Sequence, residues 1–255
     1  MKLLNISEYK RQGSGNRGQE SEVRSQKNNQ IGFSSRLLTS GFRVLATVCC
    51  ILLVSCAAPR PAEMPSHKGV TLDEALAQYR KISTVNTVVA LEYEKNGTIM
   101  SGDASLAVSP DKLALRIYYL GFLQGEVYEE NGNIRSKPKI DKNKSLILVD
   151  GLKNSLFWWN ITDYEVLDRN DSYELRNGQR KVLVNKESLL PVEQTIQLED
   201  GDIISINYGT PARIAPEDAK DIAGDSPLSW YPSAVKIQLR NYIVRINVKS
   251  YSITR

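Results

Sequence analysis

Cysteine and histidine are nearly absent from most of this chain. The three cysteines, Cys49, Cys50 and Cys56, all lie in the first quarter of the 255 residues, and His67 is the only histidine. Residues 57–255 can therefore form neither a disulfide nor a thiolate metal site, and this part of the chain must be stabilised by its core. A single imidazole without partners does not support a metal site or a histidine base, so we expect His67 to be solvated.

Sequence motifs of catalysis are missing as well. The chain has no Gly-x-Ser-x-Gly elbow, no Walker loop and no His-Glu-x-x-His. Its acid pairs, Glu129-Glu130 and Glu217-Asp218, are sequence neighbours, and neighbours on a strand point to opposite faces. Composition leaves open a glycosidase whose two carboxylates converge from distant strands, but nothing favours it. We expect a protein without catalytic residues, cofactor or metal.

An excess of charge of one sign is also lacking once the N-terminal segment is set aside. Residues 1–55 hold eight of the 33 Lys and Arg and three of the 29 Asp and Glu, which leaves 25 basic and 26 acidic residues. Nucleic-acid binding normally requires a concentrated basic face. The sequence therefore gives no support for a nucleic-acid partner.

The longest apolar run, residues 44–54, is too short to span a bilayer as an ordinary helix. Arg36 and Arg43 precede it, and Leu53-Val54-Ser55-Cys56 ends it in the residue order of a bacterial lipoprotein cleavage site. We interpret residues 41–55 as a lipoprotein signal peptide. Cys56 is then the lipidated first residue of the mature protein. A plain secretory signal and a single membrane anchor are the alternatives.

The segments around this site differ in composition. Residues 1–40 are polar and aperiodic, which indicates disorder or an over-long gene start. Residues 56–68 carry Pro59, Pro61 and Pro65 and are predicted to be a lipidated cysteine followed by a flexible tether. Residues 69–255 are enough for one domain. Ala57 after the lipidated cysteine resembles the residue that lets enterobacterial lipoproteins pass to the outer membrane, so we expect the periplasmic face of that membrane.

Hydrophobic periodicity predicts one helix followed by many strands. Thr71 and Glu74 form a capping box for a helix over residues 72–79, and the period then changes from 3.6 to 2. Asn-Gly and Asp-Gly pairs separate several of the alternating segments. The predicted strands are residues 85–93, 99–108, 113–119, 123–130, 145–149, 163–167, 172–176, 180–185, 192–199, 202–208, 234–240 and 242–253.

About ten or eleven strands joined mainly by hairpins predict a mainly β (α+β) fold: a curved antiparallel sheet forming an open half-barrel. Residues 151–159 are predicted to be a short helix that covers the mouth or inner face as a lid, and residues 214–230 a long loop or small helix. Inward positions are apolar, as they would be in a hydrophobic cavity or an ordinary core, and the long curled sheet under one or two short helices favours a cavity. They are Val89, Leu91, Leu113, Leu115, Ile117, Val127, Ile196, Leu198, Ile206, Ile237, Ile246 and Val248, with Phe157 and Trp158 from the lid.

Part of this pattern resembles a known family. Residues 113–127, Leu-Ala-Leu-Arg-Ile-Tyr-Tyr-Leu-Gly-Phe-Leu-Gln-Gly-Glu-Val, look like the third strand, Leu-Gly loop and fourth strand of the LolA/LolB superfamily. Residues 191–208 look like its later hairpin. Together with the cleavage-site cysteine, the tether and the midchain helix, the similarity points to the LolB side of that superfamily and covers residues 71–252.

The resemblance implies a receptor without catalysis. Such a protein accepts the acyl chains of lipoproteins from a LolA-like periplasmic carrier into a hydrophobic cavity and inserts the lipoproteins into the outer membrane. The loop between the third and fourth strands would aid insertion, which makes Leu120, Phe122 and Leu123 the candidate membrane-insertion residues. These three side chains could instead continue the strands and pack inside. Two other functions remain open: a structural or interaction lipoprotein of an envelope assembly, with a packed core and no lipid ligand, and a carrier of another amphiphile.

Overall fold

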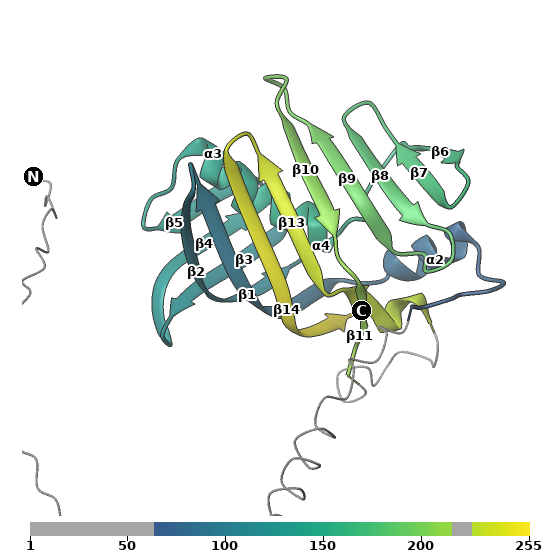
Figure 1. Ribbon diagram of the computed structural model, residues 1–255, viewed down its shortest axis with the longest axis horizontal. Coiled ribbons are helices and arrows are strands. Elements are labelled where there is room, and N and C mark those ends of the chain that lie inside the picture. The colour runs from purple at the N-terminus through teal and green to yellow at the C-terminus, as the bar shows by residue number, and fades with distance from the viewer. Residues whose placement is uncertain (1–63, 216–225) are drawn as a thin grey trace, which may run out of the picture. The chain divides into compact units, whose positions relative to one another are not determined.

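A computed structural model describes residues 64–215 and 226–255 of the chain (Figure 1). The predictions for Cys56, for the signal peptide and for residues 1–40 concern residues outside these ranges. Within the described ranges, no helix has the length and apolar character needed to cross a membrane.

The first described element is helix α2, Leu72–Tyr79, which begins as its sequence predicts. The amide of Glu74 donates to Thr71 Oγ1 at 3.3 Å, and the amide of Thr71 donates to Glu74 Oε2 at 2.8 Å. This reciprocal capping box satisfies two amides that the first helical turn leaves without partners. Leu72, Leu76 and Tyr79 are buried, so the predicted apolar face is the one that packs on the domain.

Two antiparallel meanders follow along the chain. The first consists of β1 (Thr84–Lys95), β2 (Thr98–Val108), β3 (Lys112–Tyr119), β4 (Phe122–Glu130) and β5 (Asn133–Lys137). The second consists of β6 (Glu165–Asp168), β7 (Ser172–Arg176), β8 (Arg180–Asn185), β9 (Pro191–Gln197) and β10 (Ile203–Tyr208). The sequence did not reveal β5, because Asn-Ile-Arg-Ser-Lys has one apolar residue and no alternation to detect.

A C-terminal hairpin joins the two meanders into one sheet (Figure 1). Strand β14 (Tyr242–Thr254) pairs with β1 from Lys95↔Tyr242 to Thr84↔Thr254, and β13 (Ala234–Leu239) pairs with β10. The sheet therefore has twelve strands, in the order β5-β4-β3-β2-β1-β14-β13-β10-β9-β8-β7-β6. Because β5 and β6 remain edges, the curved sheet is an open half-barrel, as predicted.

A small second sheet flanks residues 214–230, the region predicted to be a long loop or a small helix, of which residues 216–225 lie outside the described ranges. Strands β11 (Pro211–Arg213) and β12 (Trp230–Pro232) pair with each other, and a 3₁₀ turn, η2 (Pro227–Ser229), precedes β12. Tyr79 of α2 donates a hydrogen bond to the carbonyl oxygen of Pro227 at 3.1 Å, which ties this region to the first helix.

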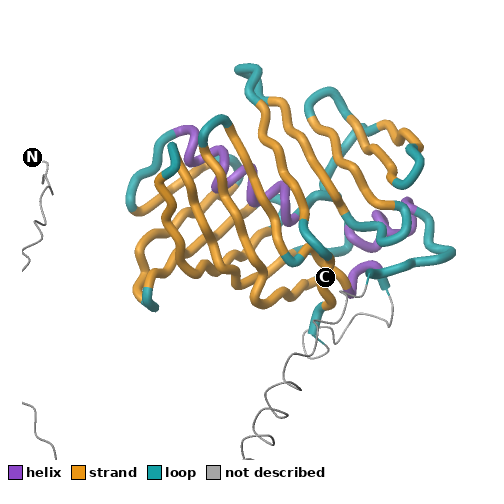
Figure 2. Tube along the Cα trace, in the orientation of Figure 1, coloured by secondary structure: helices purple, strands orange, loops and turns teal. Residues whose placement is uncertain are grey.

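One helical segment packs on a face of the sheet (Figure 2). It runs through α3 (Lys142–Ser145), a π-helical stretch, η1 (Leu146–Gly151), and α4 (Leu152–Leu156). The predicted strand over residues 145–149 is therefore wrong. Ile147, Leu148 and Val149 are all buried, and a continuous apolar run of this length is equally compatible with a buried strand and a buried helix. The helix predicted at residues 151–159 is the last part of this longer segment.

The end of the predicted tether also differs from expectation. His67 is buried, and its amide donates to the carbonyl oxygen of Glu187 at 3.0 Å. The expectation of a solvated histidine is wrong, because the chain already packs against the β8–β9 connection before α2 begins. Pro65 is buried as well, so the packed domain begins earlier than residue 69.

Gly151 sets how closely the helical segment approaches the sheet. A Cβ at this position would lie 2.8 Å from Ile237 Cγ2 on β13. We predict that Gly151→Ala lowers the free energy of unfolding by about 1–2 kcal/mol, because the clash outweighs alanine's better helix propensity. Urea denaturation measures the change. Gly178→Ala, where nothing lies within 4 Å, is the control and should stay within about 0.5 kcal/mol of the parent.

Candidate functional site: an apolar cavity beside an exposed hairpin tip

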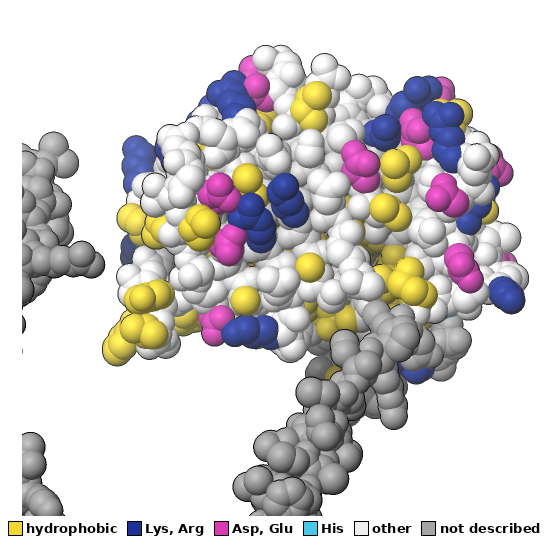
Figure 3. Space-filling model, in the orientation of Figure 1, with side chains coloured by type: hydrophobic (Ala, Val, Ile, Leu, Met, Phe, Trp, Pro, Cys, Tyr) yellow, Lys and Arg dark blue, Asp and Glu magenta, His cyan; other side chains and the backbone are white. Residues whose placement is uncertain are grey.

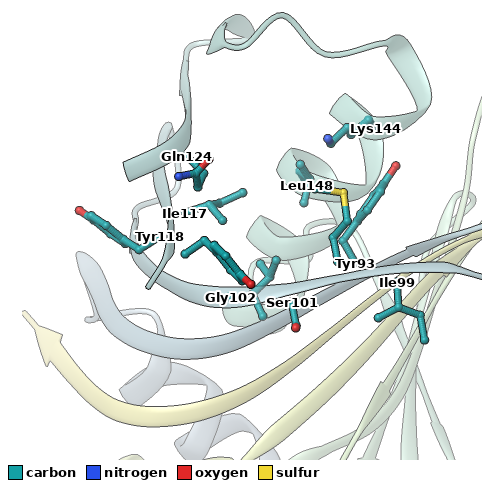
Figure 4. A pocket seen from close by; sticks show the side chains of 12 residues that line it. Tyr93, Ile99, Ser101, Gly102, Ile117, Tyr118, Gln124, Lys144 and Leu148 are labelled. Atoms are coloured by element: carbon teal, nitrogen blue, oxygen red, sulfur yellow. The ribbon is translucent and has the colours of Figure 1, made fainter. Parts of the chain in front are cut away.

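A cavity of about 440 Å³ lies between the first meander and the start of the helical segment (Figure 4). This volume falls in the range of about 300–1,000 Å³ that is typical of small-molecule sites. Strands β1 to β4 supply most of the lining, and the helical segment supplies the rest. The lining residues are Leu91, Tyr93, Ile99, Met100, Ser101, Gly102, Ile117, Tyr118, Tyr119, Gln124, Lys144 and Leu148.

One inward position of the sheet beside the cavity carries no side chain. Gly102 lies on β2 opposite Leu91 of β1, and Leu91 points into the core. A Cβ at Gly102 would lie 2.4 Å from the carbonyl oxygen of Tyr118 on β3, so the close approach of the two strands requires glycine here. Gly102 and Leu148 of the helical segment both line the cavity.

Polar groups in the lining are few. Burial, reinforced by the neighbouring Tyr242, raises the pKa of Tyr93 to about 12, so this phenol is neutral at physiological pH. The Lys144 ammonium lies 4.8 Å from the centroid of the Tyr93 ring, within cation–π distance. Figure 4 shows Lys144 and Gln124 on different sides of the space, with Ile117 and Leu148 between them. The cavity is therefore apolar, with a single cation at its border.

The β3–β4 hairpin ends beside this cavity and exposes its apolar residues to solvent. Leu120, Phe122 and Leu123 have exposed fractions of 80%, 72% and 52%. They do not continue the strands into the core. The two-residue turn has φ of +50° at Leu120 and +82° at Gly121, the pattern of a type I′ turn. We refer to residues 119–123 as the hairpin tip.

Leucine is an unusual first residue for this turn. The neighbouring hairpins use Asn96-Gly97 and Asn131-Gly132, with nearly the same positive φ values. Asparagine tolerates this left-handed conformation, whereas for other residues with a side chain it costs about 1–2 kcal/mol. The chain thus uses the favoured pair at two turns and an exposed leucine at the third.

Exposed hydrophobic side chains gather around the tip. Among the described residues, twelve large hydrophobic side chains are exposed, and six of them belong to the tip or to the adjoining part of β2. Figure 3 shows hydrophobic side chains clustered at the lower left, where Figure 1 places the end of the β3–β4 hairpin. The six are Ile99, Met100, Tyr119, Leu120, Phe122 and Leu123.

Most of the residues predicted to line a cavity belong to the packed core. Leu91 and Ile117 do line the cavity. The others are buried in the core or packed against it. They are Val89, Leu113, Leu115, Val127, Ile196, Leu198, Ile206, Ile237, Ile246 and Val248. The sequence did not reveal Gly102, Lys144 and Leu148 as cavity residues. Glycine has no side chain to detect, and residues 145–149 were predicted to be a strand although they are helical.

Phe157 and Trp158 also require a correction, because they lie in an aromatic cluster away from the cavity lining. The ring of Tyr79 stacks on Trp159 at 4.9 Å and meets Trp158 edge-on at 5.0 Å, and Phe157 lies 5.0 Å from Trp159. Phe157 and Trp158 are each only 2% exposed. This cluster closes the end of the helical segment against α2, so the aromatic residues act as core here.

A buried arginine fixes the same end of the segment. Arg180 of β8 donates from Nη1 to the carbonyl oxygen of Asn160 at 2.7 Å and from Nη2 to that of Trp158 at 2.9 Å. Nη2 also donates to Gln194 Oε1 at 3.2 Å, and no described carboxylate pairs with the guanidinium. Burial lowers its pKa to about 10, so it stays charged at neutral pH, next to the carbonyl end of a helix.

Metal ligation finds no support in the described ranges, where no three His, Cys, Asp or Glu side chains are grouped so as to hold an ion. The cavity and the tip therefore offer mainly apolar contact, together with one cation, one amide side chain and a few hydroxyl groups. That chemistry suits a hydrophobic chain better than a polar substrate.

Comparisons with known proteins add three distant structural likenesses. No protein-family model matches the sequence, and no curated protein matches it. A LolA superfamily protein from Nitrosomonas europaea is 11% identical, with a TM-score of 0.46 over 73% of this chain and 95% of that chain. A DUF1329 family protein from Desulfovibrio piger is 12% identical, with a TM-score of 0.42 over 71% and 90%.

The third is a domain from Vibrio parahaemolyticus described as an outer membrane lipoprotein-sorting protein domain. It is 8% identical, with a TM-score of 0.38 over 72% of this chain and 94% of that chain. At these identities and TM-scores the likenesses carry no conclusion about function. The strand order of this chain by itself establishes the open, curved antiparallel sheet.

Arg180 should be needed to hold the closed end of the helical segment. We predict that Arg180→Met lowers the free energy of unfolding by about 3 kcal/mol, because it leaves buried carbonyl oxygens without donors. Lys181→Met changes the next residue, which is half-buried, and should cost less than about 1 kcal/mol. Guanidinium unfolding followed by tryptophan fluorescence tests both variants, and equal losses would contradict the role given to Arg180.

Proposed function

We propose that this chain is a lipid-handling lipoprotein of the bacterial envelope, with no catalytic activity. Its cavity accepts an acyl chain, and its hairpin tip enters the membrane. In its most specific form, the proposal is a receptor that takes lipoproteins from a soluble periplasmic carrier and inserts them into the outer membrane. The observation that carries it is the position of the cavity, whose lining includes Tyr119 of the exposed apolar tip.

The cavity lining matches what an acyl chain requires. A hydrocarbon chain makes no hydrogen bonds, so burial against Leu91, Ile117 and Leu148 supplies its binding free energy, at about 0.8 kcal/mol per methylene group. Lys144 and Gln124 border the space and suit the polar end of an amphiphile. A chain bound here would have its polar end near the tip.

The tip is disadvantageous for folding in two separate ways. Leu120 occupies a left-handed backbone position that asparagine adopts with less strain, and its side chain is 80% exposed. Insertion into lipid offsets both costs, since each fully buried side chain of this kind contributes about 1.5–3 kcal/mol. A tip with these properties is better explained by membrane contact than by stability.

The lipid expected on Cys56 would keep the domain close to a membrane surface. The outer membrane is the proposed location on the basis of Ala57. The tip would then act on the same membrane that holds the anchor.

A second candidate is an interaction lipoprotein of an envelope assembly. The free edges of the sheet, β5 and β6, favour it, because an unpaired edge can accept a strand from another protein. This function needs no ligand in the cavity. Acyl binding therefore separates the two candidates.

Filling the cavity should abolish acyl binding. We predict that the chain from residue 57 onward, made without its own lipid, binds a diacylated lipopeptide in native mass spectrometry. Ile117→Trp should weaken this binding at least tenfold because the indole occupies the space where the chain would lie. Val192→Trp adds the same ring at an exposed position on β9 and should bind normally. If the parent protein binds no lipopeptide, the proposal is wrong and the interaction lipoprotein is favoured.

Reciprocal exchange of two turn residues should separate membrane contact from stability. We predict that Leu120→Asn preserves or raises the free energy of unfolding, by up to about 1 kcal/mol, because it relieves the strained turn. The same change should weaken vesicle binding at least tenfold and slow the transfer of bound lipopeptide to vesicles, through loss of an inserting side chain.

The matched control is Asn131→Leu, which places leucine in the same kind of turn at the β4–β5 connection. It should lower stability by about 1 kcal/mol and leave vesicle binding unchanged. Flotation with vesicles and thermal unfolding measure both properties. Normal vesicle binding by Leu120→Asn would show that the tip does not insert.

A further inference from the structure

A short segment beside the cavity concentrates positive charge in a domain whose basic and acidic residues nearly cancel overall. Residues 135–144 contain five cations and a single carboxylate, Asp141. We refer to these cations as the basic rim: Arg135, Lys137, Lys139, Lys142 and Lys144. Their spacing follows β5, the connection after it and the start of α3.

The positive charge of the rim is largely unneutralised. Arg135, Lys137 and Lys139 are exposed, and none forms an ion pair with a described carboxylate, although Lys137 lies opposite Glu126 in the β4–β5 ladder. Asp141 is engaged elsewhere: its Oδ1 accepts from the amide of Lys144 at 2.8 Å as a helix cap, and its Oδ2 lies 3.8 Å from Lys95 Nζ. Lys142 lies 3.8 Å from Asp200 in an exposed pair, which solvent screens.

The rim lies next to both the cavity and the hairpin tip. A Cβ at Gly125 would lie 3.3 Å from the carbonyl oxygen of Lys137 and 3.6 Å from Pro138 Cδ, so this backbone runs beside β4 three residues after Phe122. Lys144 lines the cavity together with Tyr119 of the tip. In Figure 1, β5 and α3 lie on the same side of the domain as the end of the β3–β4 hairpin.

A bilayer with anionic head groups is complementary to this side of the domain, which combines an apolar hairpin tip with a basic rim. Its hydrocarbon interior accepts apolar side chains, and its phosphate layer lies at the depth where flanking lysine and arginine residues snorkel. We propose that the basic rim binds the phosphates of anionic phospholipids while the hairpin tip enters the bilayer. The inference rests on the proposed membrane contact of the tip and adds a lipid selectivity to it.

The expected strength follows from the number of unpaired cations. Each lysine or arginine near an anionic surface strengthens binding about fivefold at low salt. The three exposed cations without partners would together give a preference of roughly one hundredfold for anionic vesicles. Because the attraction is electrostatic, raising the ionic strength should reduce the preference.

Vesicle flotation of the chain from residue 57 onward, without its own lipid, tests the rim. The vesicles are phosphatidylcholine alone and phosphatidylcholine mixed with phosphatidylglycerol. The parent protein should prefer the mixed vesicles at least tenfold at low salt. Replacing Arg135, Lys137 and Lys139 together by glutamine should remove most of that preference and leave binding to phosphatidylcholine unchanged. Free glycerol phosphate at matched ionic strength should not compete.

The matched control removes three exposed cations elsewhere, Lys68, Lys81 and Lys236, none of which forms an ion pair with a described carboxylate. This variant has the same net charge as the rim variant and should keep the preference. An equal loss in both variants, or no preference in the parent protein, would overturn the proposal. Thermal unfolding of both variants confirms that they remain folded.

The Leu120→Asn variant distinguishes failure of the rim from failure of the proposed function. If Leu120→Asn loses binding to both kinds of vesicle while the rim variant binds like the parent, the tip inserts and the rim proposal is wrong. If Leu120→Asn binds like the parent while the rim variant loses its preference, the rim binds head groups and tip insertion is wrong.

Discussion

The inward apolar face of the sheet has a larger area than the one helical segment can cover. The rest of the structure depends on this difference in area. Residues 142–156 cross only part of a twelve-stranded sheet. Apolar surface that the helical segment does not cover must pack against other elements, line a cavity or be exposed to solvent. This domain does all three: α2 and the aromatic cluster pack one end, a cavity remains at the other, and the β3–β4 hairpin extends beyond it.

The two ends of the helical segment are held differently. At the closed end, Arg180 binds the carbonyl oxygens that follow α4, and Tyr79 stacks on Trp159. Midway, Lys153 Nζ lies 2.8 Å from Glu129 Oε2 in a largely buried pair that ties α4 to β4. At the open end, Lys144 contacts the face of Tyr93 and borders the cavity. This arrangement, with one end held by several contacts and the other beside the cavity, fits the proposed receipt and release of a hydrophobic chain.

Local patterns in the sequence predicted most of the elements, and long-range pairing had to come from the structure. The capping box of α2, the Asn-Gly turns and period-2 alternation are read from neighbouring residues, and they gave the helix and eleven of the twelve strands of the main sheet. Three features escaped: the strand predicted at residues 145–149 is helical, β5 has no apolar alternation, and the pairing of β14 with β1 joins residues 147 to 170 positions apart. Leu120, Phe122 and Leu123 were recognised as candidates, but their direction was settled only by the register of β3 and β4. The cavity is lined in part by Gly102, which a search for apolar side chains cannot find.

The most direct test of the account is to locate a bound acyl chain inside the domain. Methyl-labelled protein would be titrated with a lipopeptide that carries a nitroxide on its acyl chain, and signal broadening would be followed by NMR. The account predicts that the methyl groups of Leu91, Ile117 and Leu148 broaden first, while those of Val182 and Val184 on β8 stay sharp. Broadening confined to exposed methyl groups, or none at saturating lipopeptide, would contradict it.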